Sequence, residues 1–114
     1  MMTAAVEVDV EQVLEHCEEA RLLPPIYDPT RLEQLGDRLL VDLSALVESE
    51  LVDSPVGMVR QQLSIASGFV REHSRPSLGE DPHDHLHRMA WHTRTLAYLL
   101  RDRRSQTRAG DEDQ

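Results

Sequence analysis

The stretch that decides the fold is Leu22–Val47, "LLPPIYDPTRLEQLGDRLLVDLSALV". Pro24 and Pro25 end the preceding segment, because proline lacks a backbone N–H and its ring clashes with the previous helical turn. Asp28 followed by Pro29 is the pair favoured at a helix start, where the carboxylate caps free N–H groups. The leucines that follow recur at the helical period. They are Leu32, Leu35, Leu39, Leu43 and Leu46. The stretch therefore predicts a turn followed by a long amphipathic helix.

The same start signal recurs at Ser54-Pro55 and at Asp81-Pro82, each ahead of another apolar repeat. Four helices are predicted, at 6–23, 29–52, 55–74 and 82–104. The apolar stripes of the other three helices are Val6, Val10, Val13, Cys17 and Ala20; Val56, Val59, Leu63, Ala66 and Val70; and Leu86, Met89, Thr93, Leu96 and Leu100. Steps of three and four residues are typical of helical bundles. Short connections favour an all-α, up-down-up-down four-helix bundle.

The chain of 114 residues is expected to form one domain over residues 1–104, with a short disordered acidic tail, "SQTRAGDEDQ", over residues 105–114. No apolar run approaches the roughly 20 residues that span a bilayer. The acidic N-terminus does not resemble a signal peptide. A single cysteine, Cys17, excludes an intrachain disulfide. These features predict a cytoplasmic protein without membrane contact.

The net charge of −9 is unevenly distributed. Residues 1–53 carry thirteen acids against three arginines, whereas residues 83–114 carry six arginines against five acids. One interpretation is that acidic and basic helices pack side by side. The other is a DNA-associated regulator that uses Arg94, Arg101, Arg103 and Arg104, although the acidic remainder of the chain would repel nucleic acid.

Four of the six histidines lie within Glu80–His92, "EDPHDHLHRMAWH". At about 100° per residue, His83 and His87 fall on one flank of the fourth helix, and His85 and His92 on the opposite flank. The spacing of four between His83 and His87 suits two ligands of a zinc-type divalent metal. Such a site needs further ligands from another helix or from a second copy. The alternative is that these histidines bind no metal and simply lie in the first turns of a helix.

A second stripe on the fourth helix lies almost opposite its predicted core face. This aromatic–arginine stripe consists of His87, Trp91, Arg94, Tyr98 and Arg101. Tryptophan, tyrosine and arginine dominate binding hot spots. The stripe predicts contact with a second copy, as a homodimer, or with a partner protein. The alternatives are that neighbouring helices bury the aromatic rings, or that the rings simply lie on the surface.

No constellation of residues supports an enzyme. The chain has no lysine, which excludes Schiff-base catalysis and a P-loop lysine. It also has no Gly-rich phosphate loop, no nucleophile elbow and no H-E-x-x-H. Cys17 lies on an apolar stripe and is expected to be a buried small hydrophobe.

Leu23–Val47, with "VRQQL" and "HRMAWHTRTLAYLL", resembles a family of small actinobacterial helical proteins of unknown function. Its members have an LPP-type entry and close with a helix of the form R-L-A-x-x-x-R-x-L. The residues matching that closing helix are Arg88, Met89, Ala90, Arg94 and Leu96. The resemblance implies an all-helical fold and a loose association with natural-product biosynthesis, and it carries no catalytic residues. Together with the stripe, it suggests a non-enzymatic, self-associating interaction module that is regulatory in specialised metabolism.

Overall fold

The computed structural model describes residues 7–112, and the side chains as far as Gln106. Within that range the chain is all-helical and has no strand, which confirms the predicted all-α class. The elements are α1 (Val10–Arg21), α2 (Pro29–Val47), the short 3-10 helix η1 (Glu50–Asp53), α3 (Gly57–Glu72) and α4 (Pro82–Glu112). None of these helices is both long and apolar enough to cross a bilayer.

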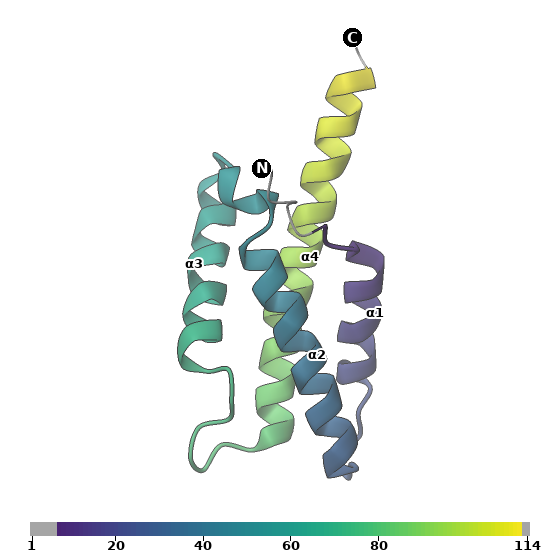
Figure 1. The fold of residues 1–114 in the computed structure, drawn as a ribbon, viewed down its shortest axis with the longest axis vertical. Helices are drawn as coiled ribbons and strands as arrows, with labels where there is room; N and C mark the ends of the chain where they lie inside the picture. Colours follow the sequence, from purple (N-terminus) through teal and green to yellow (C-terminus); the bar gives the residue numbers. More distant parts are fainter. Residues whose placement is uncertain (1–6, 113–114) are drawn as a thin grey trace, which may run out of the picture.

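Helix α4 is the common neighbour of the other elements. Figure 1 shows the chain running down α1, up α2, down α3 and up α4, so that consecutive helices point in opposite directions. Helix α4 packs against α1, α2, α3 and η1, with α2 and α1 as its main partners. Its flanks therefore face α1 on one side and α3 on the other.

Two of the predicted helix starts are confirmed by their capping bonds. An oxygen of Asp28 accepts a hydrogen bond from the backbone N–H of Thr30 at 3.0 Å. An oxygen of Asp81 accepts one from the N–H of His83 at 2.9 Å. Both carboxylates satisfy N–H groups that have no partner inside the helix.

The start of α1 differs from the expectation. The helix begins at Val10, capped by Asp9, and residues 7–9 are not helical. The predicted stripe reached back to Val6, which lies outside the described residues. Asp9 accepts a hydrogen bond from the N–H of Gln12 at 3.2 Å, so the capping signal was present in the sequence.

The predicted helix 29–52 was wrong at its end, because α2 stops at Val47. The Ser49 hydroxyl donates to the carbonyl of Leu46 at 2.6 Å and accepts from the N–H of Leu51 at 3.3 Å. These local bonds compete with helix continuation. The resulting turn η1 places Leu51 fully in the core.

The predicted start of the third helix at Pro55 was also wrong. The Ser54 hydroxyl accepts a hydrogen bond from the N–H of Val56 at 3.2 Å, forming a turn, and α3 begins only at Gly57. Val56 is 51% exposed and does not belong to the core stripe. The helix ends at Glu72 rather than at residue 74.

Helix α4 is longer than expected. The sequence predicted an end at residue 104 and a disordered tail over 105–114. Helical backbone instead continues to Glu112, while residues 113 and 114 lie outside the described range. No proline interrupts residues 105–112, so the chain can continue the helical hydrogen bonds.

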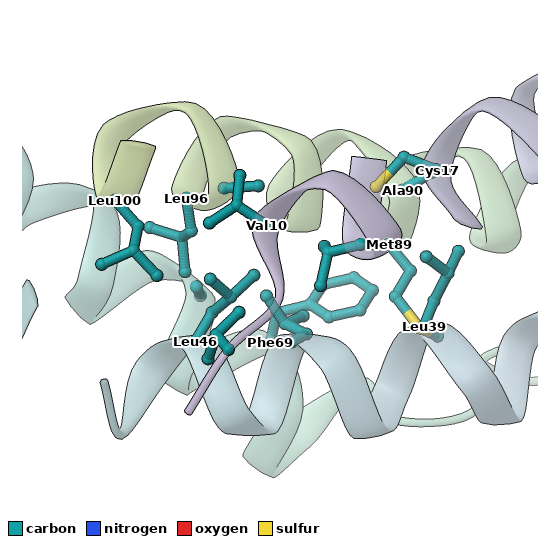
Figure 2. Close-up of a cluster of buried hydrophobic side chains, with 14 of the residues drawn as sticks. Val10, Cys17, Leu39, Leu46, Phe69, Met89, Ala90, Leu96 and Leu100 are labelled. Atoms are coloured by element: carbon teal, nitrogen blue, oxygen red, sulfur yellow. The ribbon is translucent and has the colours of Figure 1, made fainter. Parts of the chain in front are cut away.

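The core is mainly aliphatic, as the stripes predicted. Leucines of α2 and α4 have at most 1% of their surface exposed; they are Leu35, Leu39, Leu43, Leu46, Leu86, Leu96 and Leu100. Phe69 of α3, which the sequence did not single out, lies in the same cluster (Figure 2). Burying so large a ring contributes strongly to the stability of a small domain.

Candidate protein-interaction surface

The flank of α4 that faces α3 is closed by aromatic packing. The rings of His85 and His92 lie 5.5 and 4.9 Å from the ring of Phe69, centroid to centroid. His85 Nε2 donates a hydrogen bond to the backbone carbonyl of His73 at 2.6 Å. His85 is only 4% exposed, so its role is to join α4 to the end of α3.

A cation completes this closed flank. The guanidinium of Arg88 lies 5.6 Å from the centroid of Phe69. Burial lowers the pKa of His92, and the positive charge of Arg88 lowers it further. Both effects favour a neutral imidazole, which is compatible with packing on an apolar ring.

The other pair of histidines lies on the opposite side, where α4 begins. The rings of His83 and His87 are 4.2 Å apart. His83 Nε2 donates to the carbonyl of Leu23 at 2.8 Å, and its ring stacks on Tyr27 at 5.6 Å with an angle of 11°. His83 therefore fastens the start of α4 to the connection between α1 and α2.

This arrangement bears on the predicted zinc-type site at His83 and His87. The Nε2 atom of His83 is already engaged, and Nε2 of His87 is buried with no hydrogen-bond partner among the described residues. Within residues 7–112 no group of three or more His, Cys, Asp or Glu side chains is placed to hold a metal ion. Metal binding stays a prediction, and elemental analysis of protein prepared without a histidine tag tests it.

The aromatic–arginine stripe is accessible. Trp91 is 57% exposed, and Tyr98 is half-buried. The guanidinium groups of Arg94 and Arg101 lie 5.5 and 4.8 Å from the centroid of the Tyr98 ring, on either side of it along the helix. Such cation–π contacts hold the tyrosine in a fixed orientation.

Beside the stripe lies an open groove of about 240 Å³ between α1 and α4, here called the α1–α4 groove. Its lining residues are Leu14, Cys17, Glu18, Arg21, His87, Ala90, Trp91, Arg94 and Tyr98. Four of the five predicted stripe residues thus meet at one site, whereas Arg101 lies beyond the lining. In Figure 2 Cys17 and Ala90 are seen where α1 meets α4.

The sequence reasoning missed the wall that α1 contributes. Leu14, Glu18 and Arg21 follow one another at steps of four and three, which places them on one side of a helix. That spacing was a usable signal for a shared face. It did not indicate that this face would lie next to the aromatic–arginine stripe, since that depends on how the two helices pack.

The floor of the groove is apolar and its rim is charged. Burial raises the pKa of the Cys17 thiol to about 12, and the nearby Asp42 carboxylate adds to the rise, while Arg94 opposes it. The thiol is therefore protonated and behaves as a small hydrophobe. At the rim, Arg21 and Glu18 form an ion pair at 2.6 Å.

The arginines proposed for DNA contact are not equally available. Nε of Arg104 donates to Glu50 at 2.9 Å, and its Nη1 donates to the carbonyl of Val8 at 2.7 Å. Arg94 and Arg101 are exposed, and each also lies close to the ring of Tyr98. DNA binding stays a prediction, and a mobility shift that disappears with added salt would be its signature.

Comparison of the chain with protein-family models, with curated proteins and with solved structures found no match in any of the three.

Proposed function

We propose that this protein is a non-enzymatic protein–protein interaction module, an up-down-up-down four-helix bundle that self-associates through the surface formed by α1 and α4. The observation that carries the proposal is Trp91. It is the chain's one tryptophan, it is 57% exposed, and it lies at the edge of a groove with an apolar floor.

The residue types on this surface are those expected of a binding site rather than of an ordinary exposed helix face. A tryptophan buries roughly 150–250 Å² when it is covered, which is a large gain from one side chain. It stands beside a tyrosine and two arginines, the residue types that dominate hot spots. Because Arg94 and Arg101 already hold Tyr98, less conformational entropy is lost when a partner covers it.

The wider setting of the proposal comes from the sequence. A regulatory role in actinobacterial specialised metabolism is supported by the resemblance of roughly residues 20–102 to a family associated with natural-product biosynthesis, and a cytoplasmic location by the single cysteine. The proposed surface lies mostly in the part of the chain that carries this resemblance, since its α4 residues fall in "HRMAWHTRTLAYLL".

The test is the mass of the protein in solution. We expect light scattering on the wild type to show a mass that rises with concentration toward that of a dimer. The double variant Trp91→Ala with Tyr98→Ala should remain a monomer. Val41→Ala is the matched control, because Val41 is an exposed apolar residue of α2, at 69%, away from the groove.

A wild type that stays monomeric at every concentration would contradict self-association. So would a double variant that dimerises as well as the wild type, since the surface would then not be the one involved.

A further inference from the structure

We infer that the second copy binds face to face, with a two-fold axis parallel to α1 and α4, so that α4 of each copy lies on α1 of the other. This inference rests on the proposed self-association and adds the geometry of the complex. It follows from the distribution of charge over the surface that holds the α1–α4 groove.

The α1 side of this surface is acidic. Glu11, Glu15 and Glu18 are all exposed. Glu18 lines the groove and is already paired with Arg21 at 2.6 Å, whereas the ion pairs among the described residues include neither Glu11 nor Glu15. Glu11 precedes Glu18 by seven residues, or about two helical turns, so both lie on nearly the same side of α1.

The α4 side is basic at the same spacing. Arg94 and Arg101 are exposed and are also seven residues apart, on the side of α4 that carries Tyr98. The surface therefore presents a helix that stays acidic after the Glu18–Arg21 pair is counted, beside a helix with two exposed arginines.

The acids and the arginines also match in height along the bundle. Helices α1 and α4 run in opposite directions (Figure 1). Glu11 and Arg104 line one open pocket where α1 begins. Arg101 lies one helical turn before Arg104, and therefore close to the level of Glu11. Glu18 and Arg94 line the same groove lower down.

Symmetry then distinguishes two ways of joining this surface to itself. An axis parallel to the helices places the acidic helix of each copy on the basic helix of the other, at equal height. An axis across the helices places α4 on α4 and α1 on α1, so that like charges face each other. Like-charge contacts disfavour an association and opposite charges favour it, and the parallel axis is therefore selected.

The same arrangement covers the exposed tryptophan. With the parallel axis, Trp91 of one copy lies level with the groove of the other, whose floor includes Leu14, Cys17 and Ala90. Both copies make the same contact, so the contact is isologous and closes at two subunits. This assigns the surface to a second copy of this chain.

A charge-swap cycle tests the geometry. The dissociation constant of the dimer is measured by analytical ultracentrifugation at low salt for the wild type, Glu11→Arg, Arg101→Glu and the variant carrying both changes. Each single change meets a like charge at two symmetric positions, and we expect about tenfold weaker dimerisation. The double variant restores opposite charges and should return to within about threefold of the wild type.

Two controls accompany the cycle. Glu33→Arg, on an exposed position of α2, changes the net charge as Glu11→Arg does, and it should leave the dissociation constant unchanged. Thermal melting of each variant at a concentration that favours monomers shows whether the bundle itself is intact.

The outcomes separate the two proposals. A wild type that never dimerises overturns both the self-association and this geometry. A wild-type dimer that neither single change weakens, or a double variant as weak as the single ones, overturns the parallel arrangement and leaves self-association in place.

Discussion

The two flanks of α4 carry similar side chains and have different surroundings. On the flank facing α3, His85 and His92 pack against Phe69, and Arg88 covers the ring. On the flank facing α1, Trp91 and Tyr98 border an open groove.

The difference arises from the neighbouring helices. Helix α3 supplies a large ring, Phe69, which fills the space beside α4. Helix α1 supplies Leu14 and Cys17 instead of a large ring, and Trp91 beside them is 57% exposed. Rings on the closed flank therefore stabilise the fold, and rings on the open flank are available to bind.

The largest effect is expected at Phe69. Changing Phe69→Ala should lower the free energy of unfolding by about 3–5 kcal/mol, because it leaves a cavity in the core and removes the support of two histidines. Urea denaturation followed by circular dichroism measures the loss. A change below about 1 kcal/mol would show that this flank is not a stabilising cluster.

A smaller loss is expected where α1 is held to α2. His16 Nδ1 and Asp42 Oδ2 are 2.6 Å apart, and both side chains are 14% exposed. Changing Asp42→Ala should cost about 1–2 kcal/mol, because it leaves the partly buried His16 without its partner. Asp37→Ala, at an exposed position of the same helix, is the control and should change the unfolding midpoint little. Equal effects for the two variants would mean that the pair does not anchor α1.

The closed flank should also make stability depend on pH. The pKa of His92 in the folded protein is below its ordinary value of 6.5. Stability from this residue is therefore fully present above pH 6.5 and is lost as the pH falls toward the folded pKa, since the unfolded chain takes up the proton first. His92→Gln should flatten this part of the profile of unfolding free energy against pH. A variant with the wild-type profile would contradict the assignment.

The smallest effect on the fold is expected on the open flank. Trp91→Ala should lower the unfolding free energy of the monomer by about 1 kcal/mol or less, since the side chain is 57% exposed and its main ring contact is the edge of His92 at 5.2 Å. The measurement is made at a concentration low enough to keep the protein monomeric. A loss similar to that of Phe69→Ala would show that Trp91 stabilises the fold rather than a complex.

Local chemistry explains which parts of the fold were predictable. The starts at Asp28-Pro29 and Asp81-Pro82 depend on a carboxylate and a proline that are adjacent in the sequence. The same reasoning failed at Ser54-Pro55, where the serine closes a turn with Val56 instead. A serine hydroxyl can cap the start of a helix or close a short turn. At Ser54 the turn is formed, next to η1 and the buried Leu51.

The candidate site was predictable in part for the same reason. Counting angles along one helix was sufficient to place Trp91, Arg94 and Tyr98 together, because their spacing is local. The groove itself was not foreseen, since its other wall comes from α1. That contact is tertiary, and a period in the sequence shows which face is apolar without showing which helix will lie beside it.

The most direct test of the central claim is the fluorescence of Trp91. Because the chain has one tryptophan, its emission reports on this surface alone. As the concentration rises and the mass doubles, we expect the emission to shift to shorter wavelength and quenching by iodide to fall, because a second copy covers the ring. An emission and a quenching that stay unchanged while the mass doubles, or a mass that stays that of a monomer at every concentration, would contradict the account.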